Sequence, residues 1–475
     1  MFFEILYFLI IATSIILLIM ENRKPYIAIF WVIILILLPV VGLLLYLLLG
    51  KDYRSHRVIK PDEMHRLAFL RDSANHHLIR KNTHSEKYDK LSAMMLHAND
   101  APLFDGNNVR IFTDFTPMFQ SMLDDIEHAQ TYVHIQFYKI EDDEVGRQLS
   151  DLLIRKAQQG LDVRLMYDSF ANLFVSSRYY DHMRRGGVHV QSFLKLIPSM
   201  FTRDVNCRTH RKIVVVDGTV GYTGGMNIAR RYRDGISHAP WRDTHIRILG
   251  PAVSQLELAL LADWRFCTRQ LLDSKKYFPT NATTQPHNNP TSNALVQIIT
   301  SGPMDDWNTV MQGMVQAIAQ SRRYLYLQTP YFIPNQPILL ALRNAAIAGV
   351  DVRIMMPATA DRSRIMLLAS QSYFREAMQA GIKIYLYRRG YLHAKTMVLD
   401  DDFLTIGSTN IDSRSMEQNF EVNAFIYDNQ LAVRQRDIFL DDLQHCTQVL
   451  PDQWLHRNLL QRIPESVARL FTPLL

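Results

Sequence analysis

The chain has 475 residues, of which 48% are hydrophobic and 21% charged, and its net charge is +6 at neutral pH. This length allows two or three domains with substantial cores, and the positive charge suits an anionic partner such as lipid headgroups or nucleic acid. The three cysteines, Cys207, Cys267 and Cys446, are too few and too scattered for a disulfide framework or a zinc site, and the sequence has no short solenoid repeat.

Two apolar stretches come first. Phe2–Met20 is apolar except for Glu4, and Tyr26–Leu49 carries no charge. Each is long enough to cross a bilayer, and Pro39 is the expected kink site of the second. A signal peptide is the alternative for the first stretch, but it has neither a basic start nor a small-residue cleavage site. We therefore expect residues 1–50 to form two transmembrane helices.

Positive residues flank the two stretches unequally. Two lie between the stretches and four follow the second: Arg23 and Lys24, then Lys51, Arg54, Arg57 and Lys60. Because such residues concentrate on the cytoplasmic side, this bias places the large remainder of the chain in the cytoplasm. We expect residues 51–100 to form a juxtamembrane connector. A membrane anchor favours lipid over nucleic acid, and the sequence shows neither an aromatic stacking platform nor a helix-turn-helix signature.

The rest of the chain is a duplication. Gly160-Leu-Asp-Val-Arg164 matches Gly349-Val-Asp-Val-Arg353, and each lies in a succession of strand, helix, glycine and strand. Such successions predict an α/β fold with helices flanking a sheet. We place the first half at residues 101–278 and the second at 294–475. Residues 279–293 between them are rich in Pro, Asn and Thr, which indicates a linker or exposed loop; a functional lid is the alternative.

One motif of the duplication carries chemistry. Each half has a histidine and a lysine two residues apart, followed by an aspartate and an asparagine: His210, Lys212, Asp217 and Asn227, then His393, Lys395, Asp400 and Asn410. The apolar runs between Lys and Asp predict buried strands, on which residues two apart point the same way. Imidazole is a nucleophile or proton carrier near neutral pH, and ammonium neutralises phosphate oxygens. Two copies predict one active site for phosphate chemistry, built from both halves.

With these motifs the sequence resembles the phospholipase D superfamily from about Ala101 to the C-terminus. The apolar N-terminal stretches, the segment Gln328-Thr-Pro-Tyr-Phe-Ile-Pro334 and the ending Ala468–Leu475 are most similar to bacterial cardiolipin synthases. The resemblance implies a duplicated α/β sandwich of the phospholipase D type with a shared site. It also implies that one histidine attacks phosphorus while the other carries the proton. The usual assignment makes His210 the nucleophile and His393 the acid and base.

Further side chains complete the expected site. Lys212 and Lys395, with Asn227 and Asn410, are expected to hold the non-bridging phosphate oxygens. Because the sequence has no carboxylate or Cys/His cluster with ligand spacing, we expect neither a metal ion nor another cofactor in the chemical step.

Supporting groups are expected around the histidines. The resemblance nominates Asp243 and Glu421 as the carboxylates that hold the far nitrogens of the imidazoles; an ordinary surface acid is the alternative for each. Asp217 and Asp400 lie five residues beyond the lysines, at strand ends, where a carboxylate bonds turn amides rather than phosphate. Ser408 is a candidate substrate ligand, although Gly225 at the matching position indicates that a hydroxyl is dispensable there.

These features predict a membrane-anchored cardiolipin synthase of the bacterial inner (cytoplasmic) membrane. One phosphatidylglycerol would give a phosphatidyl-enzyme and glycerol, and a second would take up the phosphatidyl group. Phosphatidylethanolamine is an alternative donor. The competing interpretations are a phospholipase D or another phosphatidyltransferase, a tethered nuclease, and a non-catalytic membrane scaffold. In Leu459–Leu475, mixed apolar and basic residues leave a membrane-docking helix and a core-packed helix both open.

Overall fold

The computed structural model describes residues 2–20, 25–49, 59–83, 85–194, 207–236, 239–280, 293–360 and 363–472. Two sheets with the same strand order form the body of the protein after residue 100. The first sheet has the order β5 (His189–Phe193), β4 (Asp162–Asp168), β3 (Tyr132–Phe137), β7 (Ile213–Val216), β8 (Val220–Gly224), β10 (His245–Leu249) and β2 (Leu103–Phe112). The second has the order β14 (Lys383–Tyr387), β13 (Asp351–Pro357), β12 (Tyr324–Gln328), β16 (Thr396–Leu399), β17 (Phe403–Gly407), β18 (Asn419–Tyr427) and β11 (Ala294–Ser301).

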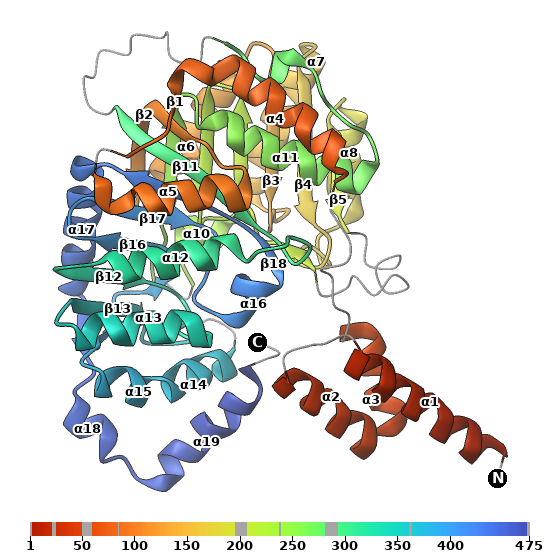
Figure 1. Cartoon of the computed structure of the whole chain (residues 1–475). Coiled ribbons are helices and arrows are strands. Elements are labelled where there is room, and N and C mark those ends of the chain that lie inside the picture. The colour runs from red at the N-terminus through yellow and green to blue at the C-terminus, as the bar shows by residue number, and fades with distance from the viewer. Residues whose placement is uncertain are drawn as a thin grey trace.

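Strand direction repeats along with strand order. In each sheet the first three strands are mutually parallel and the remaining pairs are antiparallel. The structure therefore confirms the predicted duplicated α/β fold. Figure 1 shows the first half in yellow and green above the second half in teal and blue.

Strand β2 joins the two sheets. It pairs antiparallel with β10 of the first sheet and with β11 of the second. The side chain of Asn107 on β2 secures this junction: its Nδ2 donates to the carbonyl of Ala294 (3.2 Å), and its Oδ1 accepts from the backbone N–H of Ala252 (2.9 Å). One strand thus belongs to both halves, so the halves are held in a fixed relation.

Amphipathic helices cover the sheets. The first half carries α6 (Phe115–Glu127), α7 (Glu144–Gln158), α8 (Ser177–Arg185) and α11 (Val253–Thr268), and the second carries α12 (Thr309–Gln320), α13 (Gln336–Ile347), α14 (Arg364–Ser372), α15 (Phe374–Gln379) and α17 (Asn429–Leu443). Helix α7 illustrates the local cause. Asp143 caps its first turn by accepting from Gly146 N (3.0 Å), and Val145, Leu149 and Leu153 recur at helical spacing and are buried.

The predicted connector packs against both halves. Its helices α4 (Pro61–Asn75) and α5 (Glu86–Asn99) contact α11 and α12 respectively, and β1 (Ile79–Arg80) pairs with β2. Arg71 on α4 is fully buried and donates to Gln255 on α11 (2.6 Å). Of the predicted linker, residues 281–292 lie outside the described residues.

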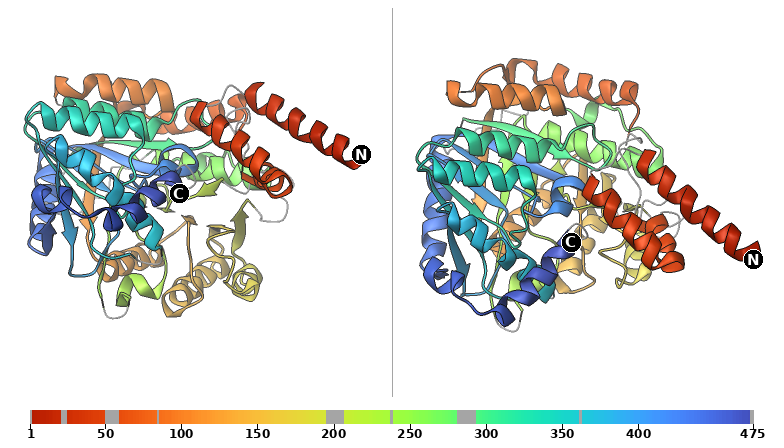
Figure 2. Two further views of the ribbon diagram at one scale, coloured as in Figure 1. Left: turned by 90° about the horizontal axis from the view of Figure 1, so that it is seen from below. Right: turned by 60° about the horizontal axis from the view of Figure 1, so that its bottom comes forward.

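The N-terminal helices differ from the expected pair of spans. α1 is Phe2–Met20, but the second stretch is divided into α2 (Pro25–Leu37) and α3 (Pro39–Leu49). The rings of Trp31 and Tyr46 lie 5.5 Å apart, so α3 folds back along α2. The break falls at the predicted Pro39, but the result is a hairpin rather than one kinked span. Of the described helices, none is long and apolar enough to cross a membrane. Figure 2 shows α1–α3 beside the body that the two sheets form.

The motif aspartates accept hydrogen bonds from the backbone at the start of a neighbouring strand in both halves. Asp217 follows β7 and accepts from the backbone N–H groups of Gln130, Thr131 and Tyr132 at the start of β3 (2.8, 2.8 and 2.9 Å). The second half repeats this geometry, where Asp400 accepts from the N–H groups of Arg322, Arg323 and Tyr324 (2.7, 2.8 and 3.0 Å). Both aspartates have a positive φ, 50° and 53°, as a tight turn requires.

We expect Asp217→Ala to lower the free energy of unfolding by about 2 kcal/mol, because three N–H groups lose their acceptor and alanine is disfavoured at this positive φ. Urea unfolding followed by circular dichroism measures the change. Asp217→Asn is the matched control, since it keeps one acceptor oxygen and tolerates the same backbone angle, and it should lose less. Wild-type stability combined with loss of activity would instead give Asp217 a direct role in catalysis.

Candidate active site

Each motif histidine is hydrogen bonded, through its backbone, to the opposite half of the molecule. His210 follows β6 (Arg208–Thr209), which pairs with the start of β18, and its N–H donates to the carbonyl of Phe420 (2.8 Å). His393 follows β15 (Tyr391–Leu392), which pairs with β9 (Trp241–Arg242), and its N–H donates to the carbonyl of Arg242 (2.7 Å). These short parallel pairs bring the two motifs together.

The histidine side chains are paired across the halves in the same way. Nδ1 of His210 lies 3.0 Å from Oε2 of Glu421, and Nδ1 of His393 lies 2.7 Å from Oδ2 of Asp243. Both carboxylates are fully buried. Each histidine therefore takes its carboxylate from the other half, and neither half contains a complete pair.

The buried carboxylates are held in the ionised form. Burial alone opposes ionisation of Asp243, but Lys395 and His393 outweigh it and keep the pKa of the Asp243 carboxyl below its ordinary value. Burial likewise opposes ionisation of Glu421, and here His210 and Lys212 lower the pKa. An ionised acceptor fixes the imidazole proton on Nδ1 and leaves Nε2 with its lone pair.

The two lysines directly precede β7 and β16 and lie close to their histidines. Lys212 Nζ donates to the carbonyl of His210 (2.6 Å), and Lys395 Nζ donates to the carbonyl of His393 and lies 2.8 Å from its Nδ1. Burial lowers the pKa of Lys212 to about 7 and that of Lys395 to about 8. Burial therefore disfavours the charged form of both lysines, and an anion bound between them would stabilise that form.

The same charges keep both imidazoles neutral. Burial, then Lys395, lowers the pKa of His393 to about 3, against the opposing effect of Asp243. Burial also lowers the pKa of His210, and Lys212 and Lys395 add to this effect. Because Lys395 of the second half acts on His210 and Lys212 of the first half acts on His393, the four side chains form one electrostatic unit.

Aromatic rings surround the histidines. The ring of Tyr138 lies 5.0 Å from that of His210, edge to face, and also lies below Lys212 Nζ (5.3 Å). His393 is bounded by Trp241 (5.3 Å) and Tyr391 (6.1 Å). Such walls exclude water and strengthen the electrostatic interactions inside the site.

The two motif asparagines differ in their hydrogen bonding, and the two motif aspartates lie away from the histidines. Asn227 is buried, and both ends of its side-chain amide are hydrogen bonded within the protein. Its Oδ1 accepts from Lys139 N (3.2 Å), and its Nδ2 donates to the Tyr232 hydroxyl (2.6 Å). Asn410 is also buried, but its Oδ1 has no hydrogen-bond partner among the described residues. Asp217 and Asp400 lie at the opposite ends of β7 and β16 from the histidines and bond backbone amides.

Ser408 supports a carboxylate. Its hydroxyl donates to Oε2 of Glu421 and accepts from Val422 N (3.0 Å). At the matching position in the first half, a Cβ on Gly225 would lie 2.1 Å from Oδ1 of Asp243, so only glycine fits there. This difference between the halves follows the different lengths of the two carboxylate side chains.

Sequence reasoning missed three residues near the centre. Asp168 is fully buried at the end of β4 and accepts from the backbone N–H of Thr209 (3.2 Å), the residue before His210. Tyr138 directly follows β3, and Arg211 lies between the motif histidine and lysine. The signal for Asp168 and Tyr138 is their place at the carboxyl ends of parallel strands, where α/β folds bind ligands.

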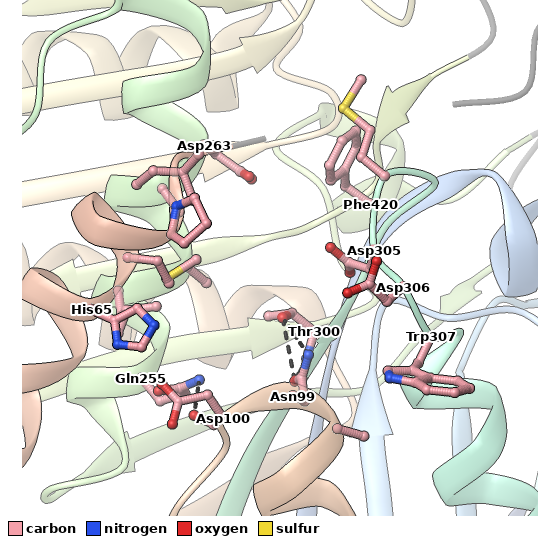
Figure 3. A pocket seen from close by; sticks show the side chains of 18 of the residues that line it. His65, Asn99, Asp100, Gln255, Asp263, Thr300, Asp305, Asp306, Trp307 and Phe420 are labelled. Atoms are coloured by element: carbon pink, nitrogen blue, oxygen red, sulfur yellow. Dashed lines mark hydrogen bonds between the residues drawn. The ribbon is translucent and has the colours of Figure 1, made fainter. Parts of the chain in front are cut away.

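A cavity of about 370 Å³ lies beside Arg211, the residue between His210 and Lys212. Arg211 and Phe420 line it, whereas their neighbours His210 and Glu421 are not among the lining residues. Figure 3 shows Asp263, Asp305 and His65 around this cavity. Within the described ranges, no group of three or more His, Cys, Asp or Glu side chains is arranged to hold a metal ion. The cavity is thus separate from the histidine centre.

Comparison with known proteins identifies the family. A family model described as "Cardiolipin synthase, PLD-like domain" matches residues 122–237 and 314–443, which contain both motifs. The major cardiolipin synthase of Bacillus subtilis is 34% identical, and the match covers 99% of this chain and 98% of that protein. The chain belongs to the cardiolipin synthase family. It is therefore a phosphatidyltransferase of the phospholipase D type.

Other similarities agree with this membership. Cardiolipin synthase 2 of Bacillus anthracis is 35% identical over 96% of this chain and 88% of that protein. A model described as "Phospholipase_D-nuclease N-terminal" matches residues 6–51. Among solved structures, phosphatidylserine synthase of Haemophilus influenzae has a TM-score of 0.59 at 15% identity, covering 81% of this chain and 98% of that one. The last match shows a shared fold.

Arg211, between the motif residues His210 and Lys212, forms a buried ion pair with Asp263 that we expect to stabilise the fold. Arg211 Nη1 lies 2.8 Å from Oδ1 of Asp263, and both side chains are buried. Arg211→Ala should lower the free energy of unfolding by about 3–5 kcal/mol, because a buried carboxylate loses its counter-ion. Adding Asp263→Asn should recover most of the loss. Denaturant unfolding of both variants tests this, and equal stability of the single and double variants would contradict it.

Proposed function

We propose that this protein is a bacterial cardiolipin synthase that joins two phosphatidylglycerol molecules into cardiolipin and releases glycerol. The crossed arrangement of the site carries the proposal: two imidazoles, each held at Nδ1 by a buried carboxylate from the other half, lie beside two buried lysines. Transfer through a covalent intermediate needs a nucleophile, a proton carrier and fixed positive charge, and this centre offers all three.

In the first step, Nε2 of His210 attacks the phosphorus of one phosphatidylglycerol, since Nδ1 is engaged by Glu421. The phosphorus–oxygen bond to the terminal glycerol breaks, and His393 gives a proton to the departing oxygen. His393 must carry that proton beforehand, and the phosphate anion held by Lys212 and Lys395 supplies the negative charge that favours the imidazolium. The products are a phosphatidyl-histidine and glycerol.

In the second step, the terminal hydroxyl of another phosphatidylglycerol attacks the same phosphorus. His393, now neutral, takes the proton of this hydroxyl, and the phosphorus–nitrogen bond to His210 breaks. Cardiolipin leaves and both histidines return to their starting state. Lys212 and Lys395 hold the non-bridging oxygens throughout, while Glu421 and Asp243 fix the imidazole tautomers.

The surroundings of His210 favour a lipid substrate. The segment after Asp168 exposes three large apolar side chains, Phe170, Leu173 and Phe174, of which Phe174 is 99% exposed. The guanidinium of Arg208, two residues before His210, lies over the ring of Phe170 (5.1 Å). An apolar loop beside a phosphate site suits acyl chains better than it suits nucleic acid.

We further propose that the chain resides in the bacterial inner membrane through α1–α3, with its catalytic region in the cytoplasm. Exposed apolar side chains along α1–α3, among them Ile16, Ile19 and Ile33, support this location. The larger number of positive residues after Leu49 supports the orientation. The two-span topology stays a prediction.

Incubating the purified protein with pure phosphatidylglycerol in mixed micelles tests the proposed function. Mass analysis should find cardiolipin and free glycerol in equal amounts. Phosphatidic acid as the main product would make the protein a phospholipase D instead. Cardiolipin that forms only after phosphatidylethanolamine is added would assign that lipid as the donor.

The histidines should each be indispensable. We expect His210→Ala and His393→Ala to reduce cardiolipin formation by at least about 10²-fold while the protein still folds, because one loses the nucleophile and the other the proton carrier. The double variant should be no worse than either single one. If a single variant kept a tenth of the activity, the two-histidine scheme would fail.

The lysines should make phosphate binding depend on pH. Their lowered pKa values, about 7 and about 8, mean that the ammonium charge is present at lower pH and is lost as the pH rises through these values. The KM for phosphatidylglycerol should therefore increase between about pH 6 and about pH 9. Lys212→Arg, which stays charged over this range, should weaken that dependence. A KM independent of pH would contradict the assignment.

A further inference from the structure

Helix α19 (Leu459–Leu470), which α18 (Pro451–Leu455) precedes, turns an apolar face outward. Five apolar side chains of the helix, and Phe471 directly after it, are between 44% and 79% exposed. The five are Leu459, Leu460, Ile463, Val467 and Leu470. At about 100° per residue, these positions fall within an arc of about 120°. The exposed residues thus form one continuous stripe.

The opposite face holds α19 on the second half through charged groups. Glu465 is only 6% exposed and accepts two hydrogen bonds from Arg457 (2.6 and 2.8 Å). Arg469 donates to Glu376 on α15 (3.1 Å) and lies over the ring of Tyr373 (4.3 Å). The helix therefore turns the buried Glu465 inward and leaves its leucines uncovered, the reverse of what water favours.

An arginine-rich cleft of about 550 Å³ lies beside this stripe. Five arginines and two glutamates are among the residues that line it, an excess of three positive charges: Arg343, Arg375, Arg457, Arg462, Arg469, Glu376 and Glu465. The glutamates pair with Arg343, Arg457 and Arg469. Within the described part of the chain, Arg375 and Arg462 form neither an ion pair nor a side-chain hydrogen bond. Two guanidinium groups are therefore available to an anion.

We propose that α19 and this cleft bind an anionic phospholipid of the bilayer, separately from the histidine centre. Guanidinium groups match the oxygens of a phosphodiester, and the apolar stripe next to them suits acyl chains. A bilayer is a better occupant than a second copy of the chain, because a symmetric dimer would bring two positive clefts together. Figures 1 and 2 show α19 and α1–α3 at the same end of the molecule, which agrees with one membrane surface.

Direct binding tests the charged part of the site. The full chain carrying His210→Ala, to stop turnover, is titrated in non-ionic detergent with dihexanoylphosphatidylglycerol by calorimetry. Arg375→Glu with Arg462→Glu should weaken lipid binding at one class of sites by at least about tenfold. The matched control, Arg322→Glu with Arg434→Glu, makes the same charge change at two exposed arginines outside the cleft and should leave binding unchanged. Equal binding by both double variants would overturn the proposal.

The apolar part is tested with a second pair of probes. Leu460→Asp with Ile463→Asp should lower the affinity for dihexanoylphosphatidylglycerol by a similar factor. Inorganic phosphate should bind the unchanged cleft at least about tenfold more weakly than this lipid does. Phosphate that binds as tightly as the lipid, unaffected by these changes, would make the cleft a free-phosphate site and refute lipid binding. Equal affinity for dihexanoylphosphatidylcholine would refute selection of an anion. Because no arm measures product, these outcomes do not depend on the proposed reaction.

Discussion

The exchange of carboxylates between the halves is the constraint on which the site depends. His210 needs Glu421 and His393 needs Asp243, and each pair crosses the junction between the two sheets. All four side chains are at least about nine-tenths buried, so separating the halves would leave two charges without counter-ions. The parallel pairs of β6 with β18 and β15 with β9 provide the backbone part of the same junction. A duplicated chain thus gains one site that neither copy possesses alone.

Burial sets the charge state of this site. Desolvation is the largest influence on both histidines and both lysines, and in each case it disfavours the positive form. The negative charges of Glu421 and Asp243 partly offset this effect, because they attract the positive forms. The site therefore favours an anion, which would add negative charge between Lys212 and Lys395 and raise the pKa of the imidazoles.

The two halves keep the same geometry with different side chains. Asp243 is one methylene shorter than Glu421, and it reaches His393 from a backbone position where Gly225 leaves no side chain in the way. In the other pair the longer Glu421 leaves room for Ser408, whose hydroxyl bonds it. The departure of Gly225 and Ser408 from strict repetition is therefore a consequence of carboxylate length. It also makes the environments of the two histidines unequal.

Much of this protein could be predicted from local patterns. The repeated spacing of His, Lys and Asp, the apolar runs between them and the matching Gly-x-Asp-Val-Arg segments indicated a duplicated α/β fold with a shared site, because strand alternation and hydrophobic periodicity act over a few residues. The break at Pro39 was also predictable, since proline removes a helical hydrogen bond wherever it stands. That the chain then folds back, with Trp31 on Tyr46, was not predictable, because it depends on contacts between helices.

Only the tertiary structure decided which carboxylate serves which histidine. His210 and Glu421 are separated by 211 residues, and His393 and Asp243 by 150, so no local rule connects them. The outward face of α19 was equally undetermined, since its mixed sequence suited both a core and a membrane. Periodicity identifies an apolar stripe, but only the burial of Glu465 and the hydrogen bond from Arg469 to Glu376 on α15 reveal that the stripe points away from the core. Sequence therefore determined the chemical groups and their local spacing, while long-range packing decided their partners and their exposure.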